Sequence, residues 1–237
     1  MLVIKGLSKS FRNGIFSSPM SAVKNVSFSI NEGEAFGLMG SSGSGKSTIA
    51  RLILRLINAD KGKVFFRGKE LLSLSKKEYA PYRKRIQIIF QQPIQALDPK
   101  QTIFNAIAEP LLVHNLVSSG RAARKKVEHL LEVTHLSHEI LDRYPHQISG
   151  GQAQRVVIAR ALGVNPFLIV ADEPTSMLDI SAQAQILALL KKLQIEQGIG
   201  ILLISHDVSV IRHFCSRLAV IEKGEIVCQT DSSTYLN

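Results

Sequence analysis

The stretch from residue 40 to residue 48 reads Gly40-Ser41-Ser42-Gly43-Ser44-Gly45-Lys46-Ser47-Thr48. It follows an apolar segment at residues 35–39 and precedes a run at residues 47–57 in which apolar side chains recur at helical spacing. The order is therefore strand, glycine-rich loop, helix, which is the context that the pattern G-x-x-x-x-G-K-[ST] requires. This order predicts an α/β fold built around a phosphate-binding loop.

Each residue type in this loop suits the binding of nucleotide phosphates. The glycines let backbone N–H groups curl around the β- and γ-phosphates, and the helix that starts near Lys46 directs its positive dipole end toward them. We expect Lys46 to add a point charge and the Ser47 hydroxyl to be a Mg²⁺ ligand. The sequence therefore predicts that residues 40–48 bind ATP with Mg²⁺.

A second apolar run, at residues 168–171, ends in two carboxylates, Asp172 and Glu173. A buried strand that ends in acids presents them at the sheet edge where α/β proteins bind ligands. Asp172 can hold Mg²⁺ directly or through water, and Glu173 can orient or polarise an attacking water. Alone, the pair could equally be a solvated strand end. With a phosphate loop upstream, it predicts ATP hydrolysis.

The rest of the chain alternates between strand and helix patterns around a helical insertion. Residues 23–30 alternate apolar and polar, as a half-buried strand does. From residue 93 to 148 helical patterns are separated by the breakers Pro110, Ser118-Ser119-Gly120 and Pro145. After Gly151 we expect a helix, a strand at residues 167–171, a helix at 182–197 and a strand at 201–204. This alternation predicts a parallel sheet covered on both faces.

Composition narrows the function class only slightly. The chain has 237 residues, 45% of them apolar, without a run of the roughly 18 apolar residues that a membrane helix needs. It begins without a signal peptide, so we expect it in the cytoplasm. Cys215 and Cys228 are too few for a disulfide framework. The net charge of +10 permits attraction to nucleic acid, anionic lipid or nucleotide phosphates without choosing among them.

Four further elements follow in a fixed order. They are Gln91 in Ile89-Phe90-Gln91-Gln92-Pro93, the run Ile148-Ser149-Gly150-Gly151-Gln152, the run Ser176-Met177-Leu178-Asp179, and His206 after Ile204-Ser205. With them, the sequence resembles the nucleotide-binding subunits of ATP-binding cassette (ABC) transporters over nearly its whole length. The resemblance implies one ABC ATPase domain at residues 1–237, with a P-loop NTPase core of mixed sheet at 1–92 and 151–237. It also implies an N-terminal antiparallel β-subdomain and a helical signature subdomain at about 93–150.

The resemblance also implies roles for these residues. Two such domains would close head to tail, so that Ser149, Gly150, Gly151 and Gln152, the signature, meet the ATP held by the partner. Gln91 would sense Mg²⁺ and the attacking water, and His206 would contact the γ-phosphate and help hold Glu173. Ser176 and Asp179 would form the D-loop. Phe11 is the candidate for stacking on adenine, although a core position suits it nearly as well.

Local sequence is similar to that of the peptide/nickel importer group. The similar stretches are residues 144–152, residues 171–183, and Phe90-Gln91-Gln92-Pro93 followed by Leu97-Asp98-Pro99. This implies a second ATP-binding subunit, identical or homologous, two transmembrane permeases and an extracytoplasmic solute-binding protein, with the chain at the cytoplasmic face of the membrane and without nucleic acid. Ile148 and Gln92 depart from the usual leucine and acid. The end at Asn237 favours the short nickel-type form, and hence a metal chelate over a peptide.

Two other functions remain as alternatives. A soluble ABC-type ATPase acting on nucleic acid or ribosomes would suit the positive charge, but such proteins usually carry tandem cassettes or coiled-coil insertions. A phosphotransferase of the P-loop kind would have no use for the signature, Gln91 and His206 motifs.

Overall fold

The computed structural model describes residues 1–12 and 19–235, which form two compact units. The first unit contains residues 1–83 and the chain from residue 194 onward, and the second contains residues 84–193. Asn237, the chain end used in the prediction of a short form, lies outside the described residues.

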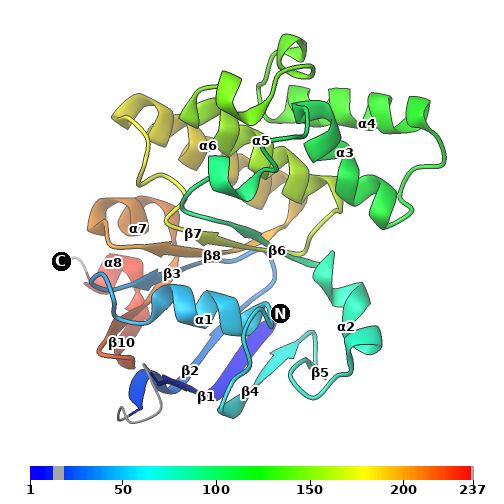
Figure 1. Cartoon of the computed structure of the whole chain (residues 1–237). Coiled ribbons are helices and arrows are strands. Elements are labelled where there is room, and N and C mark those ends of the chain that lie inside the picture. The colour runs from blue at the N-terminus through cyan, green and yellow to red at the C-terminus, as the bar shows by residue number, and fades with distance from the viewer. Residues whose placement is uncertain (13–18, 236–237) are drawn as a thin grey trace. The chain divides into compact units, whose positions relative to one another are not determined.

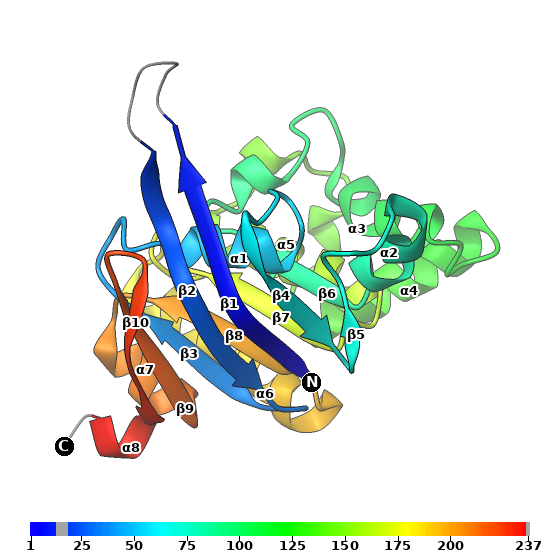
Figure 2. The same ribbon diagram turned by 90° about the horizontal axis from the view of Figure 1, so that it is seen from below.

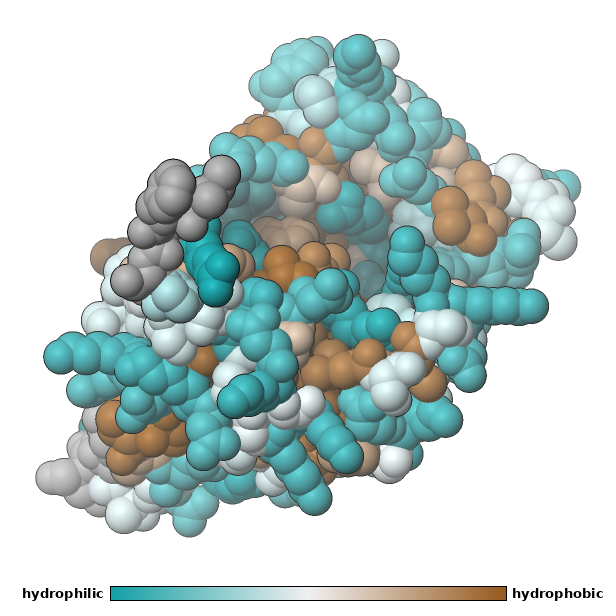
Figure 3. All heavy atoms as spheres, turned by 60° about the horizontal axis from the view of Figure 1, so that its bottom comes forward, coloured by the Kyte–Doolittle hydropathy of each residue, from teal (hydrophilic) through white to brown (hydrophobic). Residues whose placement is uncertain are grey.

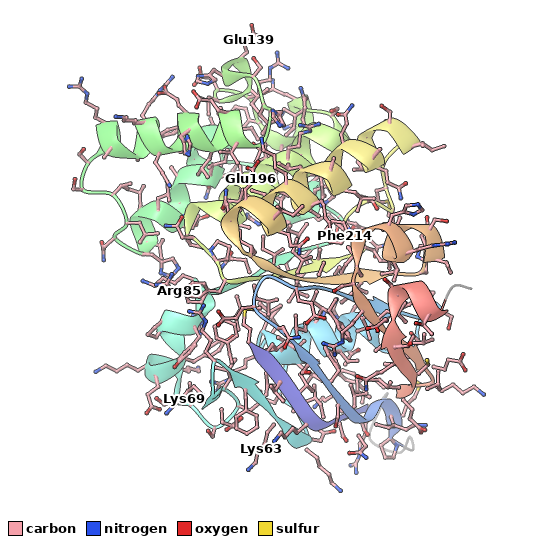
Figure 4. The ribbon with its side chains drawn as sticks, turned by 180° about the vertical axis from the view of Figure 1, so that it is seen from behind. Lys63, Lys69, Arg85, Glu139, Glu196 and Phe214 are labelled. Atoms are coloured by element: carbon pink, nitrogen blue, oxygen red, sulfur yellow. The ribbon has the colours of Figure 1, made fainter. Side chains whose placement is uncertain are left out.

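The first unit contains an antiparallel sheet with strand order β2-β1-β4-β5. Its strands are β1 (Leu2–Phe11), β2 (Met20–Ile30), β4 (Lys61–Phe66) and β5 (Lys69–Glu70). The two longest, β1 and β2, run side by side in Figure 2. Val26, Phe28 and Ile30 of β2 are buried, whereas Lys63 and Lys69 project outward from β4 and β5 (Figure 4). This sheet confirms the predicted N-terminal antiparallel region.

A second sheet of the first unit holds the strand that leads into the phosphate loop. It runs in the order β10-β9-β3-β8, with β3 (Ala35–Met39) parallel to both β8 (Gly200–Ser205) and β9 (Arg217–Glu222). Strand β10 (Glu225–Asp231) pairs antiparallel with β9. All of β3 is buried, and α7 (Val208–Phe214) packs on it so closely that a Cβ at Gly37 would lie 2.9 Å from Ile211 Cγ2. The remaining helices of this unit are α1 (Lys46–Ile53), α2 (Lys76–Arg83) and α8 (Ser232–Tyr235).

The second unit combines a parallel strand pair with a group of helices. Strands β6 (Ile86–Ile89) and β7 (Leu168–Asp172) pair in register from Ile86 opposite Leu168 to Ile89 opposite Ala171. Helices α3 (Ile103–Val113), α4 (Gly120–Val133) and α5 (Gly150–Gly163) pack against one another (Figure 1). The short 3₁₀ turns are η1 (Ile94–Ala96), η2 (His138–Ile140) and η3 (Pro145–Gln147). The long helix α6 (Ile180–Gln197) begins here.

Two local predictions are wrong. Helix α1 ends at Ile53 and not at residue 57, because Arg55 adopts a φ of +53° and donates its guanidinium hydrogens to the carbonyls of Leu71 and Leu74. Pro110 lies inside α3 and does not break it. The helix continues one more turn there, because His114 donates its N–H to the Pro110 carbonyl at 3.1 Å. The predicted boundaries of core and helical subdomain stay a prediction.

The surface drawn in Figure 3 is mainly hydrophilic, with apolar residues in small separate patches. Within the part of the chain that the structure describes, no helix is both long enough and apolar enough to cross a lipid bilayer.

Candidate functional site

The loop between β3 and α1 has a backbone shape that side chains would disturb. Gly45, the residue before α1, has a φ of +111°, and a Cβ added there would lie 2.3 Å from the Ala22 carbonyl oxygen. A Cβ at Gly40 would lie equally close, 2.3 Å, to the Ile221 carbonyl oxygen. Real Cβ atoms do not approach an oxygen so closely, so both positions need glycine. The surrounding strands therefore hold the loop in a curled conformation.

The polar groups of this loop suit an anion. Lys46 is only 5% exposed, and its ammonium donates to the carbonyls of Gly40 at 2.8 Å and Ser41 at 2.7 Å. The Ser44 hydroxyl is buried and finds no hydrogen-bond partner among the described residues. Gly45 has no side chain with which to cap α1, so the helix begins without a side-chain cap at this position. A phosphate group would satisfy these donors together, as the sequence predicted.

Asp172 and Glu173 lie in the second unit, at the end of β7. Asp172 is buried at 7% exposure, and Glu173 has a φ of +47°. Because β6 and β7 are adjacent and parallel, the residues that follow them meet at one edge of the pair. There the Gln91 amide donates to Glu173 Oε2 at 3.2 Å. The structure thus brings together two of the residues that the sequence assigned to the hydrolysis of ATP.

The predicted signature forms the start of α5. The Ser149 hydroxyl accepts from the Gln152 backbone N–H at 3.2 Å, and Gln152 Oε1 accepts from the Ser149 N–H at 3.0 Å. This reciprocal capping box fixes the first turn, which Gly150 and Gly151 form. A Cβ at Gly150 would meet Leu178 at 3.5 Å, so the first turn of α5 lies against the predicted D-loop.

The D-loop residues are tied to the end of β7 and to the start of α6. The Ser176 hydroxyl donates to the Glu173 carbonyl at 3.2 Å. Asp179 Oδ1 accepts from the Ala182 N–H at 2.9 Å. Both bonds fix local backbone conformation; the contacts of these residues across a dimer remain a prediction.

His206 and Phe11 both belong to the first unit. His206 is exposed and follows β8, and the next residue, Asp207, caps α7 by accepting from Ser209 N–H at 2.8 Å. Phe11 ends β1 at 37% exposure, with the Lys9 ammonium 5.6 Å from its ring centroid. Opposite Phe11 in the sheet stands Met20, 63% exposed, which the sequence analysis missed because nothing in its local pattern marks it. This exposed apolar pair fits a planar base better than a core position.

The Mg²⁺ ligands predicted from the sequence are divided between the units, with Ser47 in the first and Gln91 and Asp172 in the second. Among residues 1–12 and 19–235, no group of three or more His, Cys, Asp or Glu side chains could hold a metal ion. One hydroxyl and one carboxylate still suit Mg²⁺, which keeps several waters and binds phosphate oxygens alongside one or two protein groups. The residues present therefore fit a Mg²⁺ ion that arrives with nucleotide.

Comparison with known proteins decides the family. A family model described as ABC transporter matches residues 23–176. This chain belongs to the ABC transporter family. The ABC cassette is 46% identical over 215 residues to the putative oligopeptide transport ATP-binding protein YkfD of Bacillus subtilis, covering 91% of this chain and 65% of that protein. It is 46% identical over 227 residues to the oligopeptide transport ATP-binding protein OppF of Streptococcus mutans, covering 96% and 73%. It is 47% identical over 232 residues to the glutathione import ATP-binding protein GsiA of Salmonella paratyphi A, covering 96% and 37%.

Solved structures agree with the fold. The dimeric post-hydrolysis state of the ATP-binding cassette MJ0796, bound to ADP and Pi, has a TM-score of 0.89 at 35% identity, covering 98% of this chain and 99% of that one. The cbiO1 structure from Clostridium perfringens, part of the transporter complex cbiONQ, has a TM-score of 0.85 at 27% identity, covering 99% and 89%. The predicted ABC ATPase fold and the predicted family are confirmed. So is the expectation of an ATP-binding ATPase, as the activity of this family.

Proposed function

We propose that this ABC cassette is the ATP-hydrolysing subunit of an importer for short peptides. The observation that carries the proposal is its 46–47% identity to oligopeptide and glutathione import proteins, together with a phosphate loop whose donors suit a nucleotide. These relatives favour a peptide over the nickel chelate that the short form suggested. They also favour transport over the alternative function, action on nucleic acid or ribosomes. Because the chain spans 65% of YkfD and 37% of GsiA, its own length does not bear on the choice.

The residues of this chain would divide the chemistry as follows. Lys46 exchanges the two carbonyls that it now contacts for the β- and γ-phosphates, while the N–H groups at the start of α1 hold the same oxygens. Ser47 of the first unit and Asp172 of the second would each offer an oxygen ligand to Mg²⁺, which would supply positive charge to the phosphates when bound. Glu173 would orient the attacking water and accept its hydrogen bond, with the Gln91 amide beside the carboxylate. His206 would contact the γ-phosphate, as the resemblance to the family implies.

The signature is proposed to act on a second subunit. Ser149 and the N–H groups of Gly150 and Gly151, at the start of α5, would cap the ATP held by the partner's phosphate loop. The dimeric state of the MJ0796 cassette supports a second ATP-binding subunit. Closure of this pair would switch two permeases, supplied by an extracytoplasmic solute-binding protein, from the cytoplasmic face of the membrane.

Uptake measurements test this proposal. Cells that lack this chain should lose uptake of a labelled tripeptide while nickel uptake is unchanged. The wild-type chain should restore peptide uptake, and Lys46→Ala, produced at the same level, should not. Loss of nickel uptake with intact peptide uptake would assign the other substrate class, and restoration by Lys46→Ala would remove ATP from the mechanism.

A further inference from the structure

Arg160 connects α5 to the turn that follows Gln91. It lies in the last turn of α5, partly buried, and its Nη1 donates to the Ala96 carbonyl at 2.7 Å. Burial lowers the pKa of this guanidinium, an effect that the negative charge of Glu109 on α3 opposes. A desolvated cation gains most from a short, charge-assisted hydrogen bond, so this contact is a strong one. It fixes the end of η1 to the signature helix.

The turn that Arg160 contacts is compact and anchored. Pro93 and Leu97, on either side of η1, are both buried, Leu97 at 3% exposure. The Ala96 N–H donates to the Pro93 carbonyl at 3.1 Å, and the Leu97 N–H donates to the Ile94 carbonyl at 3.2 Å. Because these bonds close two successive turns on a proline, residues 93–97 should move as one piece.

Gln91 stands only two residues before this piece, and it contacts the carboxylate assigned to hydrolysis. Its amide donates to Glu173 Oε2 at 3.2 Å, although its side chain is exposed and this hydrogen bond is longer than the usual 2.9–3.0 Å. The carbonyl of Glu173 is meanwhile held by the Ser176 N–H and hydroxyl. The backbone of Glu173 is therefore held within its own turn, and the Gln91 amide reaches the carboxylate from the segment that leads into the turn at residues 93–97.

We propose that Arg160 is a positioning residue for the hydrolytic centre: by clamping the turn at residues 93–97 to α5, it sets where Gln91 meets Glu173. The same helix begins at the signature Ser149, eleven residues earlier and about 16 Å along its axis. Through this contact, the turn that follows Gln91 is attached to the same helix that begins at the signature. This inference rests on the proposed function, because it assigns a role in ATP hydrolysis.

Two substitutions at Arg160 test the inference on the transporter complex purified from membranes. Arg160→Met keeps the length and apolar stem but has no donor, so we expect kcat for ATP hydrolysis to fall roughly 10- to 100-fold, the usual effect of misplacing a group by about 1 Å. The KM for ATP should change less than about twofold, since the phosphate loop lies in the other unit. Arg160→Lys retains a cationic donor for the Ala96 carbonyl and should recover most of kcat.

Arg155 supplies the matched control. It lies on the same helix and also donates to a backbone carbonyl, that of Thr134 at 2.9 Å, as well as to Gln185, but it does not contact the turn after Gln91. Arg155→Met should lower the thermal midpoint about as much as Arg160→Met while leaving kcat within about twofold of wild type. If both variants lower kcat equally, Arg160 has only a structural role and the inference fails.

Combination with Gln91→Ala shows whether Arg160 acts through Gln91. Once the amide is absent, its placement no longer matters, so the kcat of the double variant should equal that of Gln91→Ala within about twofold. If the kcat of the double variant falls by the product of the two single-variant decreases, Arg160 does not act through Gln91 and the inference fails, while the ATPase assignment stays intact. A wild-type complex that does not hydrolyse ATP would overturn the proposed function, and this inference with it.

Discussion

Substitution of Gly45 by alanine should strongly destabilise the nucleotide-free protein. A side chain at a φ of +111° costs about 1–2 kcal/mol in backbone strain. The added Cβ would lie 2.3 Å from the Ala22 carbonyl oxygen, so the two backbones must separate by at least about 0.7 Å to reach the 3.0 Å that real contacts require. Overpacking of this kind costs typically about 1–3 kcal/mol. The expected loss in free energy of unfolding is therefore about 2–5 kcal/mol, which corresponds to roughly 4–20 °C in Tm.

Gly43→Ala is the matched control, because it lies in the same loop with a φ of +78° and a Cβ there would meet no atom within 4 Å. It carries the backbone strain without the clash, and alanine also restricts the unfolded chain, so the net loss should be about 1 kcal/mol or less. Thermal unfolding followed by circular dichroism, without nucleotide, measures both variants. If Gly45→Ala is no less stable than Gly43→Ala, the contact with Ala22 does not constrain the loop and the argument for its rigidity is wrong.

Three further predictions concern the carboxylates and the loop lysine. Glu173→Gln should bind ATP as wild type does but lose at least about 100-fold in turnover; equal turnover would remove Glu173 from its role. Lys46→Ala should weaken ATP binding itself, measured by calorimetry, and unchanged affinity would refute the phosphate-loop assignment. Glu70 caps the N–H groups of Leu72 and Ser73 at 2.7 and 2.8 Å. Burial raises its pKa, but hydrogen bonds from the Ser73 side chain and from the backbone N–H groups of Leu72, Ser73 and Val64 outweigh burial and leave the pKa below its usual value. A carboxylate with a lowered folded-state pKa stabilises the protein above its unfolded-state pKa of about 4.3, and the stabilisation is lost as the pH falls through the folded-state pKa. Chemical denaturation should therefore show Glu70→Gln less stable than wild type at pH 7, with the difference vanishing once the pH has fallen below the folded-state pKa of Glu70. A difference that stays constant with pH would contradict the capping role.

The predicted strand bounds are most accurate where the local sequence pattern agrees with the place of the strand in the fold. Strand β3 matches its predicted range, residues 35–39, because five consecutive buried residues lead directly into the glycine loop. The end of β7 differs by one residue, since Asp172 belongs to the strand. Strand β4 was not predicted, because its first three residues are Lys61, Gly62 and Lys63, which have low strand propensity. They form a strand because they pair with β1.

In the site too, motifs could be predicted from the sequence, whereas contacts between residues far apart in the chain could not. The loop could be found because its residue types and spacing are specific to phosphate binding, and the acidic pair because it ends an apolar strand in a chain that carries this loop. The bond between Gln91 and Glu173 could not, since 82 residues separate them and only the parallel pairing of β6 and β7 brings them together. Arg160 lay within an amphipathic helical pattern that gives no reason to single out one arginine. Its contact with Ala96, 64 residues away, appears only in the structure.

The most direct test of the central claim is to identify what accompanies this chain in the membrane. The tagged chain would be purified from solubilised native membranes in ATP and Mg²⁺, with Lys46→Ala as the control for nucleotide dependence, and the co-purifying proteins identified by mass spectrometry. The proposal predicts two multi-span permeases and a second ATP-binding subunit. Recovery of soluble chain bound to nucleic acid or ribosomes would contradict it.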